Sequence, residues 1–443
     1  MTAANFSSMD FVYCCCRALG ISVIAVLLAD CGSPALGFAP ASSASAAHAN
    51  VRGLSATESV VYSFKGGKDG AYPQAALLAV GGEFYGTTSN GGAAGCAALK
   101  GCGTVYEVDT SGQERVVHAF AGGSDGEAPS GPLIDVNGNF YGVTIYGGTG
   151  CKSKYTAGCG TVYEIASTGK ERVLYRFPGH AAGAAPTSSL TYYKGALYGE
   201  AASGGTGPCE YTSIPGCGLI FKMSLSGKPS ILYRFKGGKD GGAPLGGLVP
   251  YSGSFYGVTG QGGHTCLFSY GCGTIFKLTL SDKETILHAF QGDTSDGGIP
   301  EGMTILGGAI YGATFSGGAS NCAFTGSPYG CGTVFTSTLA GKERVLHNFA
   351  SGQDGSFPNQ VVASGGNLYL TTQGGGEGGS GDRSEGTFVE VTPSGEETVL
   401  YRFKGGSDGA DPVSGLIESG KTFYGTTEGG GNASVGTVFG TTP

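Results

Sequence analysis

Ten cysteines of the chain form five closely spaced pairs, and the second member of each pair lies in a Gly-Cys-Gly sequence. The spacing is wider than the Cys-x-x-Cys of redox sites, and no further His or Cys recurs beside the pairs to complete a zinc site. In an exported chain, cysteines that occur and disappear in pairs indicate disulfides. We therefore predict five local disulfides: Cys96–Cys102, Cys151–Cys159, Cys209–Cys217, Cys266–Cys272 and Cys322–Cys331.

A second recurring feature is the motif Gly-Gly-x-Asp-Gly-x-x-Pro. Its aspartates are Asp69, Asp125, Asp240, Asp296, Asp354 and Asp408, and Ala182 holds the matching place in one copy. The composition predicts a turn, in which Asp bonds its own backbone and Gly adopts positive φ. The alternative is a polar ligand or Ca²⁺ at these aspartates, although calcium prefers six or more oxygen ligands. We expect no cofactor, and calcium is the alternative left open.

Three histidines, His118, His288 and His347, stand where other copies of the same segment have tyrosine. A position that accepts either ring is typical of a packing site. Gly122–Gly126 matches the Gly-x-Ser-x-Gly of hydrolases, but that motif requires a following helix, and here a strand pattern follows. We predict no catalytic residue.

These residues belong to a tandem repeat. An anchoring tyrosine recurs at spacings of 56, 57, 58, 55, 58 and 55 residues, at Tyr85, Tyr141, Tyr198, Tyr256, Tyr311, Tyr369 and Tyr424. Each unit offers four short strands, in the first unit Ala76–Val80, Glu83–Thr88, Thr104–Val108 and Arg115–Phe120. Both faces of these strands are apolar, and no window has helical periodicity. The pattern predicts an all-β, seven-bladed β-propeller of four-stranded antiparallel blades.

The two ends of the repeat region complement each other. Glu58–Phe64 reads as a fourth strand with no blade before it, and the last unit stops after its third strand, within Gly436–Pro443. We therefore expect the N-terminal strand to pair with Gly436–Phe439 and close the last blade, which removes a free edge. Residues 51–443 are predicted to form this single domain.

Residues 1–50 lie outside the repeat and are predicted to be a leader and a small-residue linker. The apolar run Ala18–Ala29 has the length of a signal-peptide core and is too short to span a bilayer. Leu28–Cys31 resembles a lipoprotein box in which Cys31 would be acylated, although Asp30 departs from the pattern. Cleavage of a signal peptide and acylation of Cys31 both predict a secreted, periplasmic or cell-surface protein. Membrane contact is expected only through the lipid anchor.

The repeat motifs resemble those of the GloVer (Gloeo/Verruco) family of exported bacterial repeat proteins. The resemblance rests on Leu-Tyr-x-Phe-x-Gly-Gly-x-Asp-Gly-x-x-Pro at Leu400–Pro412, on Phe-Tyr-Gly-Thr-Thr-x-x-Gly-Gly, and on Gly-Thr-Val-Phe followed by Gly-x-Glu, and it covers about 58–443. It implies an exported repeat protein with a propeller-like fold and implies no established activity.

The composition limits the classes of binding partner that we expect. Charged residues are 13% of the chain, the net charge is −8 and no basic stripe occurs, so we expect no nucleic acid. We expect a monomeric binding module for an extracellular glycan, small molecule or protein, and the alternative is an extracellular hydrolase or lyase with a site in the central funnel. Unlike polar residues clustered at one end of the channel would favour the alternative. Long loops on a rigid scaffold usually carry binding, and five loop aromatics are candidate ligand contacts: Tyr155, Tyr211, Phe268, Phe324 and Tyr329.

Overall fold

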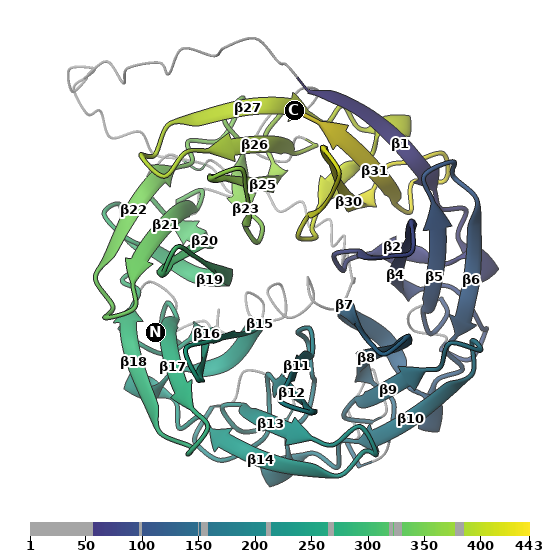
Figure 1. The fold of residues 1–443 in the computed structure, drawn as a ribbon, viewed down its shortest axis with the longest axis horizontal. Helices are drawn as coiled ribbons and strands as arrows, with labels where there is room; N and C mark the ends of the chain where they lie inside the picture. The colour runs from purple at the N-terminus through teal and green to yellow at the C-terminus, as the bar shows by residue number, and fades with distance from the viewer. Residues whose placement is uncertain are drawn as a thin grey trace, which may run out of the picture.

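Seven β-sheets are arranged radially around a central channel (Figure 1). The structure is a computed structural model, and it describes residues 56–96, 100–148, 150–151, 158–209, 214–264, 270–318, 322, 330–376 and 385–443. The predicted leader, including Cys31, lies outside the described residues. Within the described part of the chain, no helix is long and apolar enough to cross a membrane.

Each sheet is one antiparallel blade whose strands follow one another from the channel to the rim. The innermost strands of blades I to VII are β2 (Ala71–Pro73) with β3 (Leu78–Val80), β7 (Glu127–Val136), β11 (Thr191–Tyr193), β15 (Gly242–Tyr251), β19 (Gly297–Leu306), β23 (Ser356–Pro358) with β24 (Val362–Ser364), and β28 (Ala410–Pro412) with β29 (Ile417–Ser419). The second strands are β4 (Glu83–Asn90), β8 (Asn139–Tyr146), β12 (Ala196–Ala201), β16 (Ser254–Gln261), β20 (Ala309–Gly317), β25 (Asn367–Gly374) and β30 (Thr422–Gly429).

The outer half of each blade is a short hairpin. The third strands are β5 (Thr104–Asp109), β9 (Thr161–Ile165), β13 (Leu219–Met223), β17 (Thr274–Thr279), β21 (Thr333–Thr338), β26 (Thr387–Val391) and β31 (Thr437–Thr442). The fourth strands are β6 (Glu114–Ala119), β10 (Glu171–Arg176), β14 (Pro229–Arg234), β18 (Glu284–Ala289), β22 (Glu343–Asn348), β27 (Glu397–Arg402) and, for blade VII, β1 (Thr57–Ser63). The predicted seven-bladed propeller is confirmed. The first strand of blade I differs from the prediction, because Ala76 and Leu77 lie between β2 and β3.

Ring closure is confirmed by the pairing of β1 with β31. The two strands are antiparallel, with Thr57 opposite Thr442, Val60 opposite Phe439 and Ser63 opposite Thr437. The N-terminal strand therefore completes the blade that the C-terminal strands begin, and Figure 1 shows the purple β1 beside the yellow β31. Because the edge of β31 is covered, blade VII has the same four layers as the other blades.

Aromatic rings fill the space between neighbouring blades. A phenylalanine that follows each fourth strand is buried, and it meets an aromatic ring of the next blade's third strand edge-on at six of the seven interfaces. Phe64 and Tyr106 are one such pair, with ring centroids 4.9 Å apart. A glycine of the second strand leaves room for the third-strand ring: a Cβ on Gly86 would lie 2.3 Å from the Tyr106 hydroxyl. Blade VI instead pairs Leu370 with Val389.

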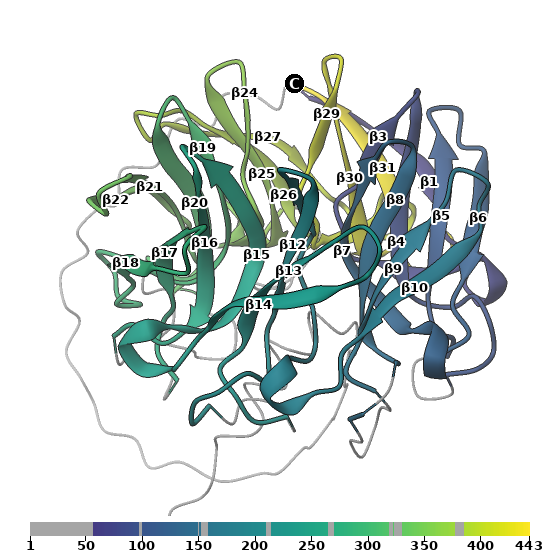
Figure 2. The same cartoon turned by 60° about the horizontal axis from the view of Figure 1, so that its bottom comes forward.

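The two faces of the ring differ in their connections. Figure 2 shows tight hairpin turns on its upper face and, on the opposite face, the longer connections with single 3₁₀ turns between blades. We call this opposite face the loop face. Gly67 of the blade VII–I connection accepts a hydrogen bond from Gly92 of the blade I loop, so the two kinds of long connection are in contact there.

Four of the five predicted disulfides are present: Cys96–Cys102, Cys151–Cys159, Cys209–Cys217 and Cys322–Cys331. The fifth pair includes Cys266, which lies outside the described residues. The bridged sulfurs of blade I pack against Gly122 of the next connection, where a Cβ would lie 2.6 Å from the Cys96 sulfur. Four disulfides are typical of a protein that folds in an oxidising, extracellular compartment.

Candidate functional site

The inner strands are directed toward the channel by a backbone conformation that recurs in every blade. The residue before the proline of each inner strand has left-handed φ, between +51° and +59°, although none of the seven is glycine. In blade II this residue is Ala128, whose N–H donates to the carbonyl of Cys102 in the preceding blade. Left-handed non-glycine residues cost roughly 1–3 kcal/mol each and persist where surrounding contacts enforce them. The bond to the neighbouring blade is such a contact, and it fixes where the next residues point.

The residues after each of these prolines leave the regular sheet ladder. In blade II the register jumps between Ser130 and Ile134, and in blade IV between Leu245 and Val249. Blades I, VI and VII break the inner strand into two pieces at the same place. These bulged segments line the channel, and they are Gln74–Ala76, Ser130–Pro132, Thr187–Ser189, Leu245–Gly246, Glu301, Asn359–Gln360 and Val413–Gly415.

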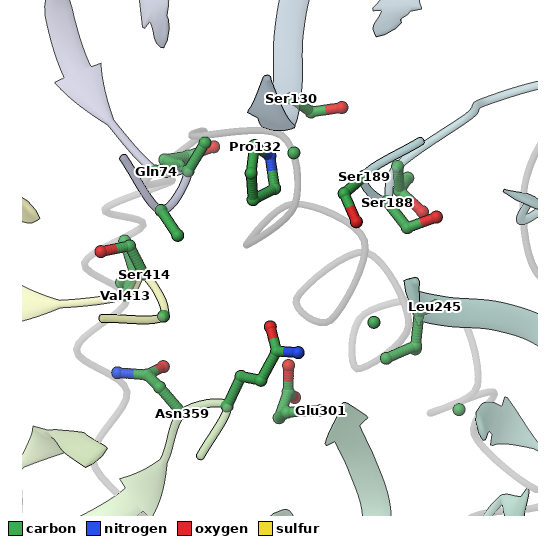
Figure 3. A pocket seen from close by; sticks show the side chains of 18 of the residues that line it. Gln74, Ser130, Pro132, Ser188, Ser189, Leu245, Glu301, Asn359, Val413 and Ser414 are labelled. Carbon is green, nitrogen blue, oxygen red and sulfur yellow. The ribbon is translucent and has the colours of Figure 1, made fainter. Parts of the chain in front are cut away.

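The bulged segments enclose a cavity of about 260 Å³ on the channel axis. Its wall also includes the ends of several second strands, such as Gln261 and Gln373, so it lies toward the loop face. Figure 3 shows Gln74, Ser189, Asn359 and Glu301 arranged around this space. The lining side chains of the described residues are hydroxyls, amides and apolar groups, with Glu301 as the one carboxylate and no Lys, Arg or His.

Two buried polar atoms of this wall, Gln74 Nε2 and Gln261 Oε1, have no hydrogen-bond partner among the described residues. In contrast, Asn359 is held: its amide donates to Thr371 Oγ1 at 2.8 Å and to the Pro412 carbonyl at 2.6 Å. Buried polar groups without a protein partner are normally satisfied by water or by a ligand. The wall therefore offers donors and acceptors to a molecule in the channel.

One carboxyl group lies directly behind the wall in blade III. Glu200 is 1% exposed and occupies the second-strand position that Thr87 holds in blade I. The N–H of Gly247 donates to Glu200 Oε2 at 3.0 Å, which links blade III to blade IV. Burial raises the pKa of Glu200 to about 8, against the smaller opposing effects of the Ser188 hydroxyl and the Gly247 N–H. Burial therefore favours the neutral form of the Glu200 carboxyl group.

The predicted aspartates lie at the rim and away from the cavity. One Oδ of each accepts the N–H of a residue four or five positions earlier, at 2.6–3.1 Å, which corresponds to the turn interpretation. None of the six lines the channel cavity. Their role in ligand binding stays a prediction, with no support from their position.

The aspartates also have side-chain partners that sequence reasoning missed. At six of the seven interfaces, the aspartate lies between the His or Tyr of one fourth strand and a glutamate at the start of the next fourth strand; the interface between blades II and III lacks both acids. Between blades VII and I, the Tyr62 hydroxyl donates to Asp69 at 2.6 Å and to Glu114 at 3.3 Å. Burial and then the charge of Asp69 raise the pKa of Glu114 to about 7. The chain contains one hint: the copy with Ala182 in place of Asp also has Pro229 in place of Glu.

The three histidines have the packing contacts that were predicted, and they also have contacts with carboxylates that were not predicted. His118, His288 and His347 pack edge-on against the next phenylalanine, at centroid distances of 4.7–4.8 Å, as a packing residue should. Each also faces the aspartate and glutamate of its interface. The five candidate loop aromatics, Tyr155, Tyr211, Phe268, Phe324 and Tyr329, lie outside the described residues, and their role stays a prediction.

A family model described as the Gloeobacter/Verrucomicrobia repeat matches the chain three times, over residues 51–213, 152–325 and 322–443. The chain belongs to this repeat family. The match covers all seven blades of this Gloeobacter/Verrucomicrobia repeat protein.

Three solved structures are similar to the chain at low sequence identity. A candidate 6-phosphogluconolactonase from Bacteroides uniformis is 14% identical, with 76% of this chain and 87% of that chain covered and a TM-score of 0.47. A luciferin-regenerating enzyme is 11% identical, with 84% and 92% covered and a TM-score of 0.42. A gluconolactonase from Xanthomonas campestris is 11% identical, with 71% and 86% covered and a TM-score of 0.38. No curated protein matches the sequence. These similarities carry no conclusion about a ligand or a reaction.

Proposed function

We propose that this protein is an exported binding module whose central channel holds a small, neutral, hydroxyl-bearing molecule, such as a sugar or another polyol. The observation that carries the proposal is the pair of buried polar atoms in the channel wall that have no partner among the described residues, Gln74 Nε2 and Gln261 Oε1. Amides and hydroxyls that both donate and accept match the hydroxyl groups of a polyol. The absence of cationic side chains from the described lining disfavours an anionic ligand.

The variation of the lining supports the same conclusion. The framework of the blade repeats, yet the residues after each inner-strand proline differ from blade to blade: Gln-Ala-Ala, Ser-Gly-Pro, Thr-Ser-Ser, Leu-Gly-Gly, Glu-Gly-Met, Asn-Gln-Val and Val-Ser-Gly. Positions that only support the ring would retain the repeat. A set of unlike side chains around one axis is suited to an asymmetric ligand. The cavity of about 260 Å³ is below the roughly 300–1,000 Å³ of drug-sized pockets, which favours a compact ligand.

A binding role is better supported than hydrolysis. Glycoside hydrolysis generally requires two carboxyl groups that face the substrate. The described lining supplies one, Glu301, while Glu200 lies behind the wall and bonds Gly247. Unlike polar residues do cluster in the channel, which was the feature expected to favour an enzyme. The described lining, however, lacks the second carboxyl group that glycoside hydrolysis needs.

Thermal-shift and calorimetric titrations with D-glucose, D-galactose, N-acetylglucosamine, myo-inositol and D-glucuronate test the proposal. We expect at least one neutral compound to raise the melting temperature, because a ligand that binds only the folded state stabilises it. The Gln74→Leu and Gln261→Leu variants should lose this shift. Gln113→Leu is the matched control, since Gln113 is exposed in a tight turn between strands three and four. Binding of glucuronate alone, or equal shifts in all variants, contradicts the proposal.

A further inference from the structure

Three of the seven blade interfaces combine one imidazole with two carboxylates. The sets are His118, Asp125 and Glu171 between blades I and II; His288, Asp296 and Glu343 between IV and V; and His347, Asp354 and Glu397 between V and VI. In each set the ligand-capable atoms lie within 4.8 Å of one another. Because the histidine comes from one blade's fourth strand and the glutamate from the next, each set joins two blades.

The atoms of these sets are enclosed and incompletely paired. The His and Asp side chains are between 4% and 24% exposed. One oxygen of each glutamate, Oε1, is buried without a hydrogen bond to the described residues. Among the described residues no lysine or arginine forms an ion pair with these carboxylates. Nε2 of His118 and of His347 also makes no hydrogen bond of good geometry. The aspartates accept backbone N–H groups, whereas Oε1 of each glutamate beside them has no donor among the described residues.

The distances separate these sets from the tyrosine-containing interfaces of the same ring. The Tyr62, Tyr233 and Tyr401 hydroxyls lie 2.5–2.7 Å from their aspartates, which is the length of a strong hydrogen bond. The histidine Nε2 atoms lie 3.5, 3.1 and 3.3 Å from theirs. Two ligands of a tetrahedral zinc ion, each at about 2.0–2.2 Å from the metal, are separated by roughly 3.3–3.5 Å. The histidine spacing is close to that value.

We propose that the three histidine interfaces are Zn²⁺ sites that fasten neighbouring blades to each other at the rim. Imidazole nitrogen and carboxylate oxygen are both zinc ligands, and two carboxylates balance the charge of a divalent ion. Each site supplies three protein ligands, and a water completes four-coordination. The tyrosine interfaces retain the two carboxylates without the nitrogen ligand. The interface between blades II and III has Tyr175, Ala182 and Pro229 at the equivalent positions and lacks all three ligands.

Zinc binding can be counted on the full-length, disulfide-bonded protein. After EDTA treatment and equilibrium dialysis against ZnCl₂, elemental analysis should give three more zinc ions per chain for the wild type than for the triple variant His118→Tyr, His288→Tyr, His347→Tyr. Zinc should raise the melting temperature of the wild type and leave that of the triple variant unchanged. The substitutions place the residue found at four equivalent positions of the same ring, so the variant is expected to fold, and near-ultraviolet circular dichroism checks this. Each single substitution should remove one ion.

A gain-of-site experiment completes the test. Tyr233→His places the nitrogen ligand beside Asp240 and Glu284 and should add one zinc ion. Tyr175→His is the matched control, because Ala182 and Pro229 supply no carboxylate, and it should add none. Equal zinc content in the wild type and the triple variant, or equal gains in the two tyrosine variants, overturns the proposal. All of these variants keep the cysteines and the remaining histidines of the wild type, so those residues cannot produce a difference in zinc content.

Discussion

Blades IV and VI use different pairs of residues at the same place in the core, and exchanging the pairs makes a quantitative test. In blade IV, Gly257 lies opposite Phe276, and a Cβ on Gly257 would lie 2.5 Å from Cζ of that ring. In blade VI, Leu370 lies opposite Val389. We expect Gly257→Leu and Phe276→Val each to destabilise the protein, and the double variant to be nearly as stable as the wild type.

The magnitudes follow from the packing. Phe276 is fully buried, so Phe276→Val leaves a cavity and should cost about 2–3 kcal/mol, less than the roughly 3–5 kcal/mol of truncation to alanine. Gly257→Leu alone forces the new side chain into the ring and should cost about 3 kcal/mol. Together the two changes conserve volume, and such exchanges usually cost below about 1.5 kcal/mol. The coupling free energy between the two changes should therefore be at least about 3.5 kcal/mol, which is above the roughly 0.5–3 kcal/mol usual for residues in contact.

Urea unfolding, followed by near-ultraviolet circular dichroism of the tyrosines, gives the four stabilities of the cycle. The Cδ2 atom of Leu248 would lie 3.3 Å from the same Cβ, and blade VI has Val361 at that position, so the cycle is best run in a Leu248→Val background. Additive costs, with the double variant less stable than either single variant, would refute the idea that the ring and the glycine are one packing unit.

The other predictions concern closure, protonation and the disulfides. Deleting β1 exposes β31 and should lower the melting temperature of the whole ring; an unchanged melting curve contradicts closure. Burial, and next the charge of Asp408, raise the pKa of Glu58 to about 8, so the folded state holds a proton that the unfolded chain releases near its lower, ordinary pKa. The stability that this group contributes is complete below the unfolded pKa and is lost as pH rises through about 8. The melting temperature should therefore fall between pH 5 and 9, and it should fall less steeply in the Glu58→Gln variant. Equal slopes in the two proteins argue against this contribution of Glu58. Replacing Cys209 and Cys217 by serine should cost about 2–3 kcal/mol in the chain-entropy model, measured by urea unfolding, and no change in the urea midpoint would show that this bridge does not stabilise the ring.

The repeat predicts the fold well because the fold depends on what recurs. The period, the paired cysteines and the complementary ends predict the blades, four observed disulfides and the β1–β31 pairing. The split of the inner strand is less predictable. The irregularity of the inner strands, whether a bulge or a split, follows left-handed residues as different as Tyr72, Ala128 and Ile299 and bonds to the neighbouring blade. Neither feature changes the hydrophobic periodicity of the sequence, from which strands are predicted.

The channel site was not predicted from the sequence, because it depends on residues that do not recur. Its residues are those that do not recur, such as Gln74, Ser188 and Glu301, so a search for repeated chemistry passes over them. The segment after each inner-strand proline could have been recognised as the part of the unit with the least internal similarity. The rim clusters could have been suspected from the joint loss of Asp and Glu at Ala182 and Pro229, but only the propeller topology brings such distant positions together.

The pairing of β1 with β31 also sets the order in which the protein can be completed during its biosynthesis. Ser63 lies opposite Thr437, its partner 374 positions later in the chain. At about 5–20 residues per second, a ribosome needs roughly 20–75 seconds to make that stretch. Throughout this time β1 has no partner strand, although it carries the apolar residues Val60 and Val61. Every chain interrupted before β31 therefore leaves β1 without its partner strand and the apolar residues of β1 without the cover of β31.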